Sequence, residues 1–471
     1  MSNQLFYIIV LSLYFVLLLV IGFITRKQTK SSSDYHIGGR RIGAVVSSFS
    51  FVAAYFSSVI IIGGGALGYR FGLATVWVAA INVVLGCFLA WAILGKKTRE
   101  LTAKYHSFTI PDFFAKRFQA PFARIFSSIV IVLFMIFYNI SILKALGETS
   151  HVLLDIPYFW GVLLSGLIVL VYVSFGGYLA VVWTGFFQAI IMGAGLLFLL
   201  IRSLSDVGGM SKLVNSLNSI NPGLVSTPGL WGFPGLLSFT LVVSFGVWGM
   251  PQMLARFYSI KDNKAIRWGT IFATIGGSMA FIPFIAGSFA RIKFPGLENP
   301  DLAIPLLVQS LLSPVGIAIF FVGVIAAGMS TFSSVLIIVS GAMVRDLFKN
   351  AFRFEMKEKK EMHWTMMTNM LIGLISIVVA LKPPGLVADL IAFSWTVIAS
   401  TCLAPFLIGL YWNGATKAGV ISSMVGGFSI SLLWMFLRQP FGIHGFIPGL
   451  VLSFLLIFIV SMLTKKDVLV N

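Results

Sequence analysis

The sequence predicts an all-α polytopic membrane protein with about 13 transmembrane helices, because of its composition, its apolar stretches and its charge distribution. Of its 471 residues, 58% are hydrophobic and only 10% are charged. Soluble proteins carry about 25% charged residues, which cover their surface. The composition therefore excludes a soluble enzyme, and it also excludes a disordered chain.

The apolar stretches are long enough to cross a bilayer, because about 20 apolar residues in a helix span the hydrocarbon. They cover residues 5–25, 44–69, 73–95, 121–146, 157–176, 179–202, 233–257, 266–290, 315–344, 366–382, 385–410, 417–437 and 446–464. A short amphipathic helix is expected at 303–312. No connecting loop is long enough to form a separate domain.

Basic residues indicate how the chain is oriented. The chain has 33 Lys and Arg against 15 Asp and Glu, a net charge of +18. Most of the basic residues fall on the cytoplasmic side if the N-terminus lies outside, as the positive-inside rule requires. We therefore expect a multi-pass monomer in the lipid bilayer of the plasma membrane, with an external N-terminus and a cytoplasmic C-terminus. Because loop charge explains the basic excess, no nucleic acid is expected as a partner.

Groups that carry catalysis are nearly absent from the predicted spans. Asp389 is the one acidic residue we find inside a span, in the first turn of its helix. The helix dipole and interfacial water stabilise a carboxylate there, and a role in transport is the alternative. Cys87 and Cys402 form no metal motif. Because a membrane enzyme needs a nucleophile, a base or a metal cluster at depth, an enzyme is not expected.

The second span contains a candidate helix break near mid-depth. The stretch from Ala53 to Ser58 is followed by Gly63 and Gly64, and the small and β-branched residues of this part of the span would permit local unwinding. An unwound turn would free backbone carbonyls to face a cavity. Close packing of helices on small residues is the alternative.

The seventh span contains a matching interruption at Gly246, Gly249 and Pro251. Proline removes a helix donor and clashes with the preceding turn, so a simple kink is the alternative here. Interrupted segments at corresponding positions of two halves indicate an inverted repeat with a binding site between the halves. The predicted organisation is an extra N-terminal helix and loop (1–43), a first repeat of spans 2–6 (44–202), a second repeat of spans 7–11 (203–410), and two accessory helices with a short tail (411–471).

The ninth span carries a stripe of neutral oxygen ligands. Ala327, Ser330 and Thr331 are spaced i, i+3 and i+4, so they share one face of the helix. The Ala327 carbonyl and the two hydroxyls are able to converge on a hard cation such as Na⁺. In the alternative interpretation, the hydroxyls only bond carbonyls one turn earlier.

Several motifs give the chain a resemblance to a known family. They are Asp34-Tyr35-His36-Ile37-Gly38-Gly39-Arg40, the stretch 63–72, Phe175-Gly176-Gly177 with Trp183-Thr184 and Gln188, and residues 326–331 with Arg345-Asp346. In these motifs the whole chain resembles the sodium/solute symporter family. Residues 93–97, 261–265, 300–302, 382–384 and 409–412 look most similar to the sodium/pantothenate branch, and the sodium/proline branch comes next.

The resemblance implies a LeuT-like fold with a five-plus-five inverted-repeat core, alternating access, and Na⁺ as the coupling ion. Matched position by position, it implies that the carbonyls of Ala53 and Phe56 bind Na⁺. The carbonyl of Ala327 and the hydroxyls of Ser330 and Thr331 would complete that site.

Two positions depart from the family pattern. Members of the family often have an Asp after the Trp-Thr pair, linked in some of them to a second Na⁺, whereas this chain has Gly185. Tyr55, beside the expected ion site, replaces a small or acidic residue. We therefore expect one Na⁺ per transported solute.

The resemblance also implies that the solute binds beside the broken helices. The candidate contacts are Ser57, Ser58, Tyr138, Asn139, Trp248 and Trp395, which supply hydrogen bonds and aromatic faces. Because no buried cation is available for a polyanion, a small monocarboxylate or zwitterion is expected, with pantothenate as the leading candidate. The sequence thus predicts a Na⁺-driven secondary transporter. A proton-coupled carrier of the same fold is the main alternative, and a channel is the other.

Overall fold

The computed structural model describes residues 3–383 and 387–464, with the side chains of all but residues 3, 59, 153 and 387–389. This part of the chain is helical, and its β pairing is limited to an isolated parallel bridge between Ile42 and Ile260. Eleven helical segments of the described residues are long and apolar enough to cross a membrane. The predicted all-α membrane architecture is therefore confirmed.

The longer helices have the following bounds: α1 Asn3–Gln28, α3 Ala44–Tyr55, α4 Ser58–Phe71, α5 Val76–Asn82, η3 Val83–Gly95, α8 Pro121–Leu154, α9 Tyr158–Val207, α11 Gly232–Gly246, α12 Pro251–Ser259, α13 Asn263–Gly277, α14 Phe281–Lys293, α16 Pro314–Gly341, η9 Ala342–Ala351, α17 Glu358–Ala380, α18 Val387–Tyr411, α19 Lys417–Phe436 and α20 Phe446–Leu463. Shorter helices connect them: α2 Ser32–Ile37, α6 Lys96–Lys104, α7 Ile110–Phe118, α10 Met210–Ile220 and α15 Ala303–Leu311. The last of these is the predicted amphipathic helix.

Two of the eleven segments reverse direction at a glycine. Gly72 (φ 66°, ψ −147°) and Gly177 (φ 58°, ψ −149°) share a backbone conformation that only glycine adopts without strain. Beyond Gly72 the chain runs back, because Tyr55 and Asn82 both donate a hydrogen bond to the Val243 carbonyl. Each of these two segments therefore contains two of the predicted spans.

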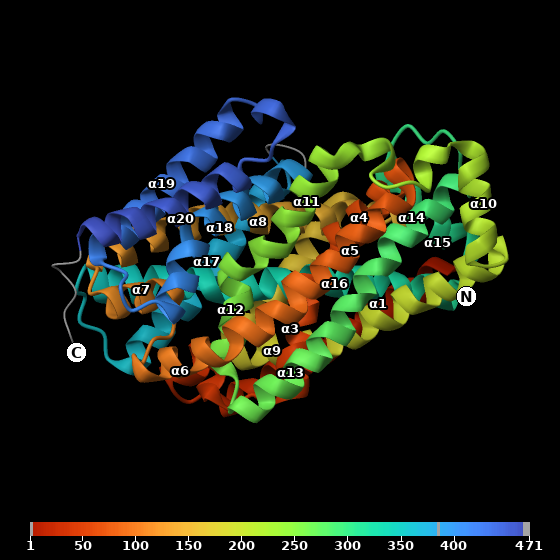
Figure 1. Cartoon of the computed structure of the whole chain (residues 1–471). Helices are drawn as coiled ribbons and strands as arrows, with labels where there is room; N and C mark the ends of the chain where they lie inside the picture. The colour runs from red at the N-terminus through yellow and green to blue at the C-terminus, as the bar shows by residue number, and fades with distance from the viewer. Residues whose placement is uncertain (1–2, 384–386, 465–471) are drawn as a thin grey trace.

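Helix α9 folds back in the same way against α1. Thr29, near the end of α1, donates to the Gly176 carbonyl, whereas Gln188 donates to the hydroxyl of Tyr14, about four turns earlier in α1. Each of the thirteen predicted spans thus corresponds to a helical segment. Helix α1 begins at one end of the bundle, here called the N-terminal end, and α20 ends at the opposite end, as an odd number of spans requires (Figure 1).

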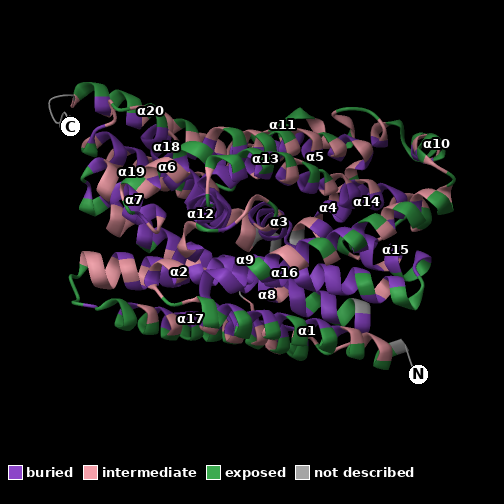
Figure 2. Cartoon of the chain, turned by 90° about the horizontal axis from the view of Figure 1, so that it is seen from below, coloured by how far each residue is buried: buried purple, intermediate pink, exposed green. Residues whose placement is uncertain are grey.

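The core of the bundle is α16, surrounded by α9, α8 and α3. Every residue of α16 from 320 to 337 is buried. Figure 2 shows buried residues concentrated along α16 and α9, whereas α1 and α17 expose their outer faces. These outer faces are apolar, with Leu13 and Val378 each 65% exposed. Such surface suits contact with lipid tails. The boundaries of the two inverted repeats at 202/203 and 410/411 stay predictions.

The helix break predicted at Gly63 and Gly64 lies elsewhere. Both glycines are inside α4, and the chain leaves the helical conformation at Phe56 (φ −80°, ψ 90°) and Ser57 (φ −80°, ψ 161°). The glycine-rich stretch instead allows α4 and α14 to touch backbone to backbone. A Cβ at Gly68 would lie 2.0 Å from the Phe284 carbonyl oxygen. The alternative of close packing on small residues is therefore correct for this stretch.

The seventh span is interrupted at Met250, which has extended backbone (φ −81°, ψ 118°). Gly246 ends the first helical half, α11, and Gly249 belongs to a short 3₁₀ turn that follows it. Pro251 is the first residue of α12. An N–H at this position has no partner within the helix, so proline loses no hydrogen bond there. The interruption is thus a complete break and not a kink within one helix.

A charged cluster lies at the end of the bundle opposite the N-terminal end, here called the α2 end. Glu361, at the start of α17, is buried and bonds Arg345, Lys349 and the Ser32 hydroxyl. His36 lies 3.7 Å from the same carboxylate. Burial lowers the pKa of His36 to about 4, with Arg345 adding to this effect and Glu361 opposing it. His36 is therefore neutral at pH 7, and its contact with Glu361 is not an ion pair.

We expect Gly287→Ala to destabilise the protein by about 3 kcal/mol, because the added Cβ would lie 1.9 Å from the Gly65 carbonyl oxygen on α4. The measurement is thermal unfolding of the purified protein in detergent. Gly43→Ala is the matched control, since a Cβ there has no atom within 4 Å. Equal melting temperatures for the two variants would contradict the backbone contact.

We expect His36→Gln to reduce the loss of stability on acidification. Below about pH 6.5 the unfolded chain protonates His36, whereas the folded chain resists protonation down to about pH 4. Stability from this group is therefore present at neutral pH and falls as the pH drops through that window. The check is the difference in melting temperature between pH 7.5 and pH 5. A drop in the variant as large as in the unmodified protein would contradict the buried neutral state.

Candidate ion and solute site

The break between α3 and α4 leaves backbone carbonyls free for other partners. The N–H of Ser57, which a continuous helix would direct to the Ala53 carbonyl, donates to the Tyr55 carbonyl instead (3.1 Å). The carbonyls of Ala53 and Ala54 in the last turn of α3 accept hydrogen bonds from another helix. The break thus turns two backbone oxygens toward α16 in the centre of the bundle.

The hydroxyls that meet these carbonyls come from the predicted stripe on α16. Ser330 donates to the Ala53 carbonyl (2.7 Å) and to the Ala327 carbonyl (2.8 Å). Thr331 donates to the Ala54 carbonyl (3.2 Å) and to the Ala327 carbonyl (3.0 Å). The two bonds to the Ala327 carbonyl are those expected if the hydroxyls only bond carbonyls one turn earlier in α16. The same hydroxyls, however, also join α16 to α3.

Four of the five predicted ion ligands therefore lie together. Phe56, the fifth, is at the break itself with extended backbone, and the second α3 carbonyl in contact with α16 belongs to Ala54. Sequence matching missed Ala54, because only the geometry of the break decides which carbonyls turn outward. The oxygens of Ala53, Ala54, Ala327, Ser330 and Thr331 form a group that we call the oxygen cluster.

The oxygen cluster is suited to a hard monovalent cation. Its residues are buried, and its ligands are uncharged carbonyls and hydroxyls of the kind that replace the hydration shell of such ions. A hydroxyl that now donates to a carbonyl has lone pairs left for a cation and needs only to turn its proton away. No group of three His, Cys, Asp or Glu side chains able to hold a metal occurs among the described residues.

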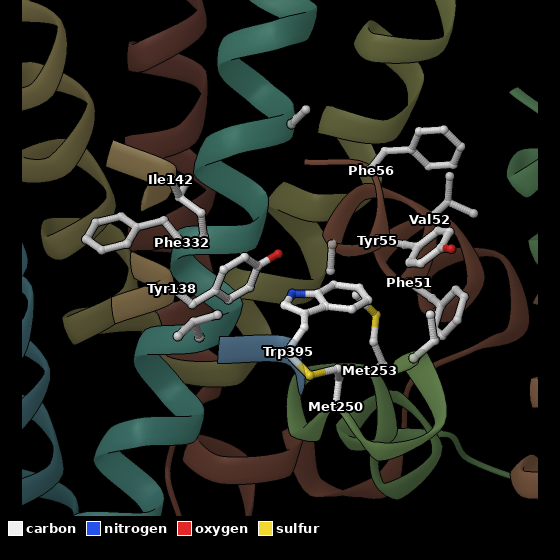
Figure 3. Packing of buried hydrophobic residues seen from close by; sticks show 14 of the residues in the cluster. Phe51, Val52, Tyr55, Phe56, Tyr138, Ile142, Met250, Met253, Phe332 and Trp395 are labelled. Atoms are coloured by element: carbon white, nitrogen blue, oxygen red, sulfur yellow. The ribbon is translucent and has the colours of Figure 1, made fainter. Parts of the chain in front are cut away.

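A cavity of about 540 Å³ adjoins the same break. Ser57 and Tyr55 line it from the two sides of the break, Tyr138 from α8 and Trp395 from α18. The indole of Trp395 lies edge-on to Tyr138, with ring centroids 6.1 Å apart. Figure 3 shows this pair between Ile142 and Phe332 on one side and Tyr55 and Phe51 on the other. The cavity is therefore large enough for a small organic molecule and has two aromatic walls.

The six predicted solute contacts divide into two groups. Ser57, Tyr138 and Trp395 line the cavity. Ser58, Asn139 and Trp248 are buried but are not part of its wall, and the Trp248 indole N–H donates to the Leu85 carbonyl (2.9 Å). The side chain of Asp389 is outside the described residues, so its role stays a prediction.

Some wall residues were not predicted from the sequence. Asn82 on α5 is a buried amide inside an apolar stretch, which is a signal that could have identified it. His444 lies between α19 and α20, and burial lowers its pKa to about 4, so it presents a neutral ring. Gly63 and Gly64 also line the cavity.

The cavity opens toward the N-terminal end of the bundle. Arg70 and Asp301, which line its wall, are exposed at that end. In the other direction it is closed by a buried aromatic layer, in which Trp91 meets Phe51 at 5.6 Å and Phe257 at 5.1 Å between ring centroids. Among the described residues, the site is thus bordered by exposed side chains toward the N-terminal end and by buried aromatic rings in the other direction.

The sequence matches the sodium:solute symporter family over residues 35–427. It is 29% identical to the osmoregulated proline transporter OpuE of Bacillus subtilis (strain 168), covering 98% of this chain and 95% of the relative. It is 30% identical to the sodium/proline symporter of Staphylococcus aureus (strain JH9), covering 97% and 93%. The sequence analysis placed the pantothenate branch first and the proline branch second. These relatives show that this order was wrong, since they support the proline branch and not the pantothenate branch.

Solved structures support the fold. A Na⁺-coupled sialic acid symporter in a substrate-bound outward-open state has a TM-score of 0.81, with 17% identity and coverage of 98% of this chain and 97% of that chain. Mhp1, a nucleobase-cation-symport-1 family transporter, has a TM-score of 0.59 at 15% identity, with coverage of 93% and 96%. The predicted LeuT-like fold is therefore confirmed.

Proposed function

Because the chain belongs to the sodium:solute symporter family, whose members are Na⁺-coupled transporters and not enzymes, we propose that it couples Na⁺ entry to the uptake of a proline-like solute. One observation carries the proposal. A two-residue break in the second span presents carbonyls to the hydroxyls of α16 on one side and Ser57 to the cavity on the other.

In this proposal, Na⁺ is the coupling ion and binds within the oxygen cluster. The carbonyls of Ala53 and Ala327 and the hydroxyls of Ser330 and Thr331 are its ligands, with Phe56 or Ala54 as the fifth. An ion at this position would replace the direct contacts between α3 and α16. Because Ser57 follows the same break, the position of the ion ligands fixes the position of the cavity wall. This shared backbone is the physical basis for coupling ion to solute.

The cavity chemistry supports a small zwitterion such as proline. Ser57 is the N-cap of α4, so the positive end of that helix dipole points at the cavity and favours a carboxylate. The faces of Tyr138 and Trp395 suit an apolar ring. Two curated relatives are named as proline transporters. Pantothenate, a larger monocarboxylate, is the second candidate solute.

The position of the cavity between exposed residues at one end and buried rings at the other supports alternating access. With an external N-terminus, as the basic residues favour, the described conformation faces outward. We propose that the aromatic layer of Phe51, Trp91 and Phe257 opens in the inward-facing state. The two inverted repeats, the monomeric state and a ratio of one Na⁺ per solute, inferred from Gly185, are part of the same proposal.

The proton-coupled alternative is disfavoured by the ligands of the site. The oxygen cluster contains no titratable side chain, and burial holds His444 neutral at physiological pH. Uptake by reconstituted vesicles separates the candidates, with proline and pantothenate as solutes and imposed Na⁺ or proton gradients as driving forces. We expect proline uptake to require the Na⁺ gradient. Uptake driven by a proton gradient alone, or non-saturable flux, would contradict the proposal.

We expect Thr331→Ala and Ser330→Ala each to raise the Na⁺ concentration for half-maximal uptake by about tenfold, because each removes a hydroxyl ligand. Ser340→Ala is the matched control on the same helix, since its buried hydroxyl bonds only the Ile337 carbonyl in the described structure. The measurement is solute uptake against Na⁺ concentration, with thermal unfolding as the check on folding. Unchanged Na⁺ dependence in both variants would refute the ion assignment.

We expect Trp395→Phe to raise the KM for the solute about fivefold, because the indole N–H and part of the cavity wall are lost. Na⁺ binding without solute should stay within twofold of the unmodified protein. Trp268→Phe, at a half-exposed position on α13, serves as control. An equal change in Na⁺ binding and solute KM would argue against Trp395 as a solute contact.

A further inference from the structure

Contrary to the expectation that the protein holds no buried cation, a buried arginine lies at the α2 side of the oxygen cluster. Arg256, on α12, is 1% exposed and donates from Nη2 to the hydroxyls of Ser334 (2.8 Å) and Ser50 (3.2 Å). Its Nη1 donates to the Gln252 carbonyl of its own helix (2.6 Å). The guanidinium therefore joins the second half of the broken seventh span to α3 and to α16.

These partners are one helical turn from the oxygen cluster on both helices. Ser50 precedes Ala53 and Ala54 on α3 by three and four residues, and Ser334 follows Ser330 on α16 by four. The Ser334 hydroxyl, which accepts from Arg256, donates to the Ser330 carbonyl (2.7 Å). A single hydroxyl thus links the guanidinium to a residue of the cluster.

The charge of Arg256 is not balanced by a carboxylate. None of the ion pairs among the described residues includes it, its Nε has no hydrogen-bond partner there, and the ring of Tyr178 lies 5.8 Å from its Cζ. The facing position on α9 is Gly185, where even a Cβ would lie 2.9 Å from the Ser50 hydroxyl. An arginine keeps its proton in proteins, so a fixed positive charge faces the cluster in a dry interior.

We propose that Arg256 is a positioning residue whose fixed charge weakens Na⁺ binding in the oxygen cluster and so favours release of the ion toward the α2 end. The inference rests on the proposed Na⁺ site. A cation one turn away repels Na⁺, and a pocket of uncharged ligands has no charge to offset the repulsion. In the described conformation, the hydrogen bonds of Arg256 to Ser50 and Ser334 also hold α12 against α3 and α16.

The test compares two variants of the full-length protein by equilibrium binding of ²²Na⁺. Arg256→Gln keeps hydrogen-bonding groups and removes the charge, so Na⁺ should bind about tenfold more tightly. Arg256→Lys keeps the charge, so its affinity should stay within about threefold of the unmodified protein. A purely structural role would instead weaken Na⁺ binding in both variants. Arg256→Met also removes the charge, and it places no polar amide in the buried site. It replaces the glutamine variant if that variant does not fold.

The outcomes separate this inference from the proposed function. Tighter binding in Arg256→Gln with little change in Arg256→Lys supports the fixed-charge role. Unchanged or weaker binding in the charge-free variant overturns the inference alone, because saturable binding by the unmodified protein would still stand. Absence of saturable Na⁺ binding in the unmodified protein would overturn the proposed function, and the inference with it.

Discussion

The contact between the broken end of α3 and the hydroxyl stripe of α16 is the constraint on which the rest of the structure depends. Carbonyls released inside a bilayer are costly unless they find partners, because no water is present to satisfy them. Ser330 and Thr331 satisfy two of these carbonyls, at Ala53 and Ala54. The contact with α16 therefore stabilises the break, at the centre of the stretch along which α16 is buried.

The sequence predicted the architecture well, because membrane helices can be recognised from the length and hydropathy of the apolar stretches that form them. It also predicted which residues of α16 meet the broken end of α3, because Ala327, Ser330 and Thr331 share one face of any regular helix. It failed where backbone conformation decides the outcome. Gly63 and Gly64 suggested a break, yet both lie inside α4 and line the cavity, and the chain unwinds earlier in the span, at Phe56 and Ser57.

The solute side of the site was harder to predict for a related reason. A Tyr or Trp in an apolar span has the same local pattern whether it faces a cavity or packs against a neighbouring helix. Tyr138 and Trp395 line the cavity, whereas Trp248 bonds a backbone carbonyl of η3. His444 reaches the cavity from the connection between two accessory helices, and only the packing of those helices on α18 brings it there.

The glycine contact between α4 and α14 has a consequence for movement. At Gly68 and Gly287, where a Cβ would lie only about 2 Å from a backbone oxygen of the opposite helix, no side chain separates the two backbones. At these contacts, a slide or roll of one helix on the other would bring backbone atoms into collision. We therefore expect a displacement that narrows the mouth of the cavity to carry α4 and α14 together.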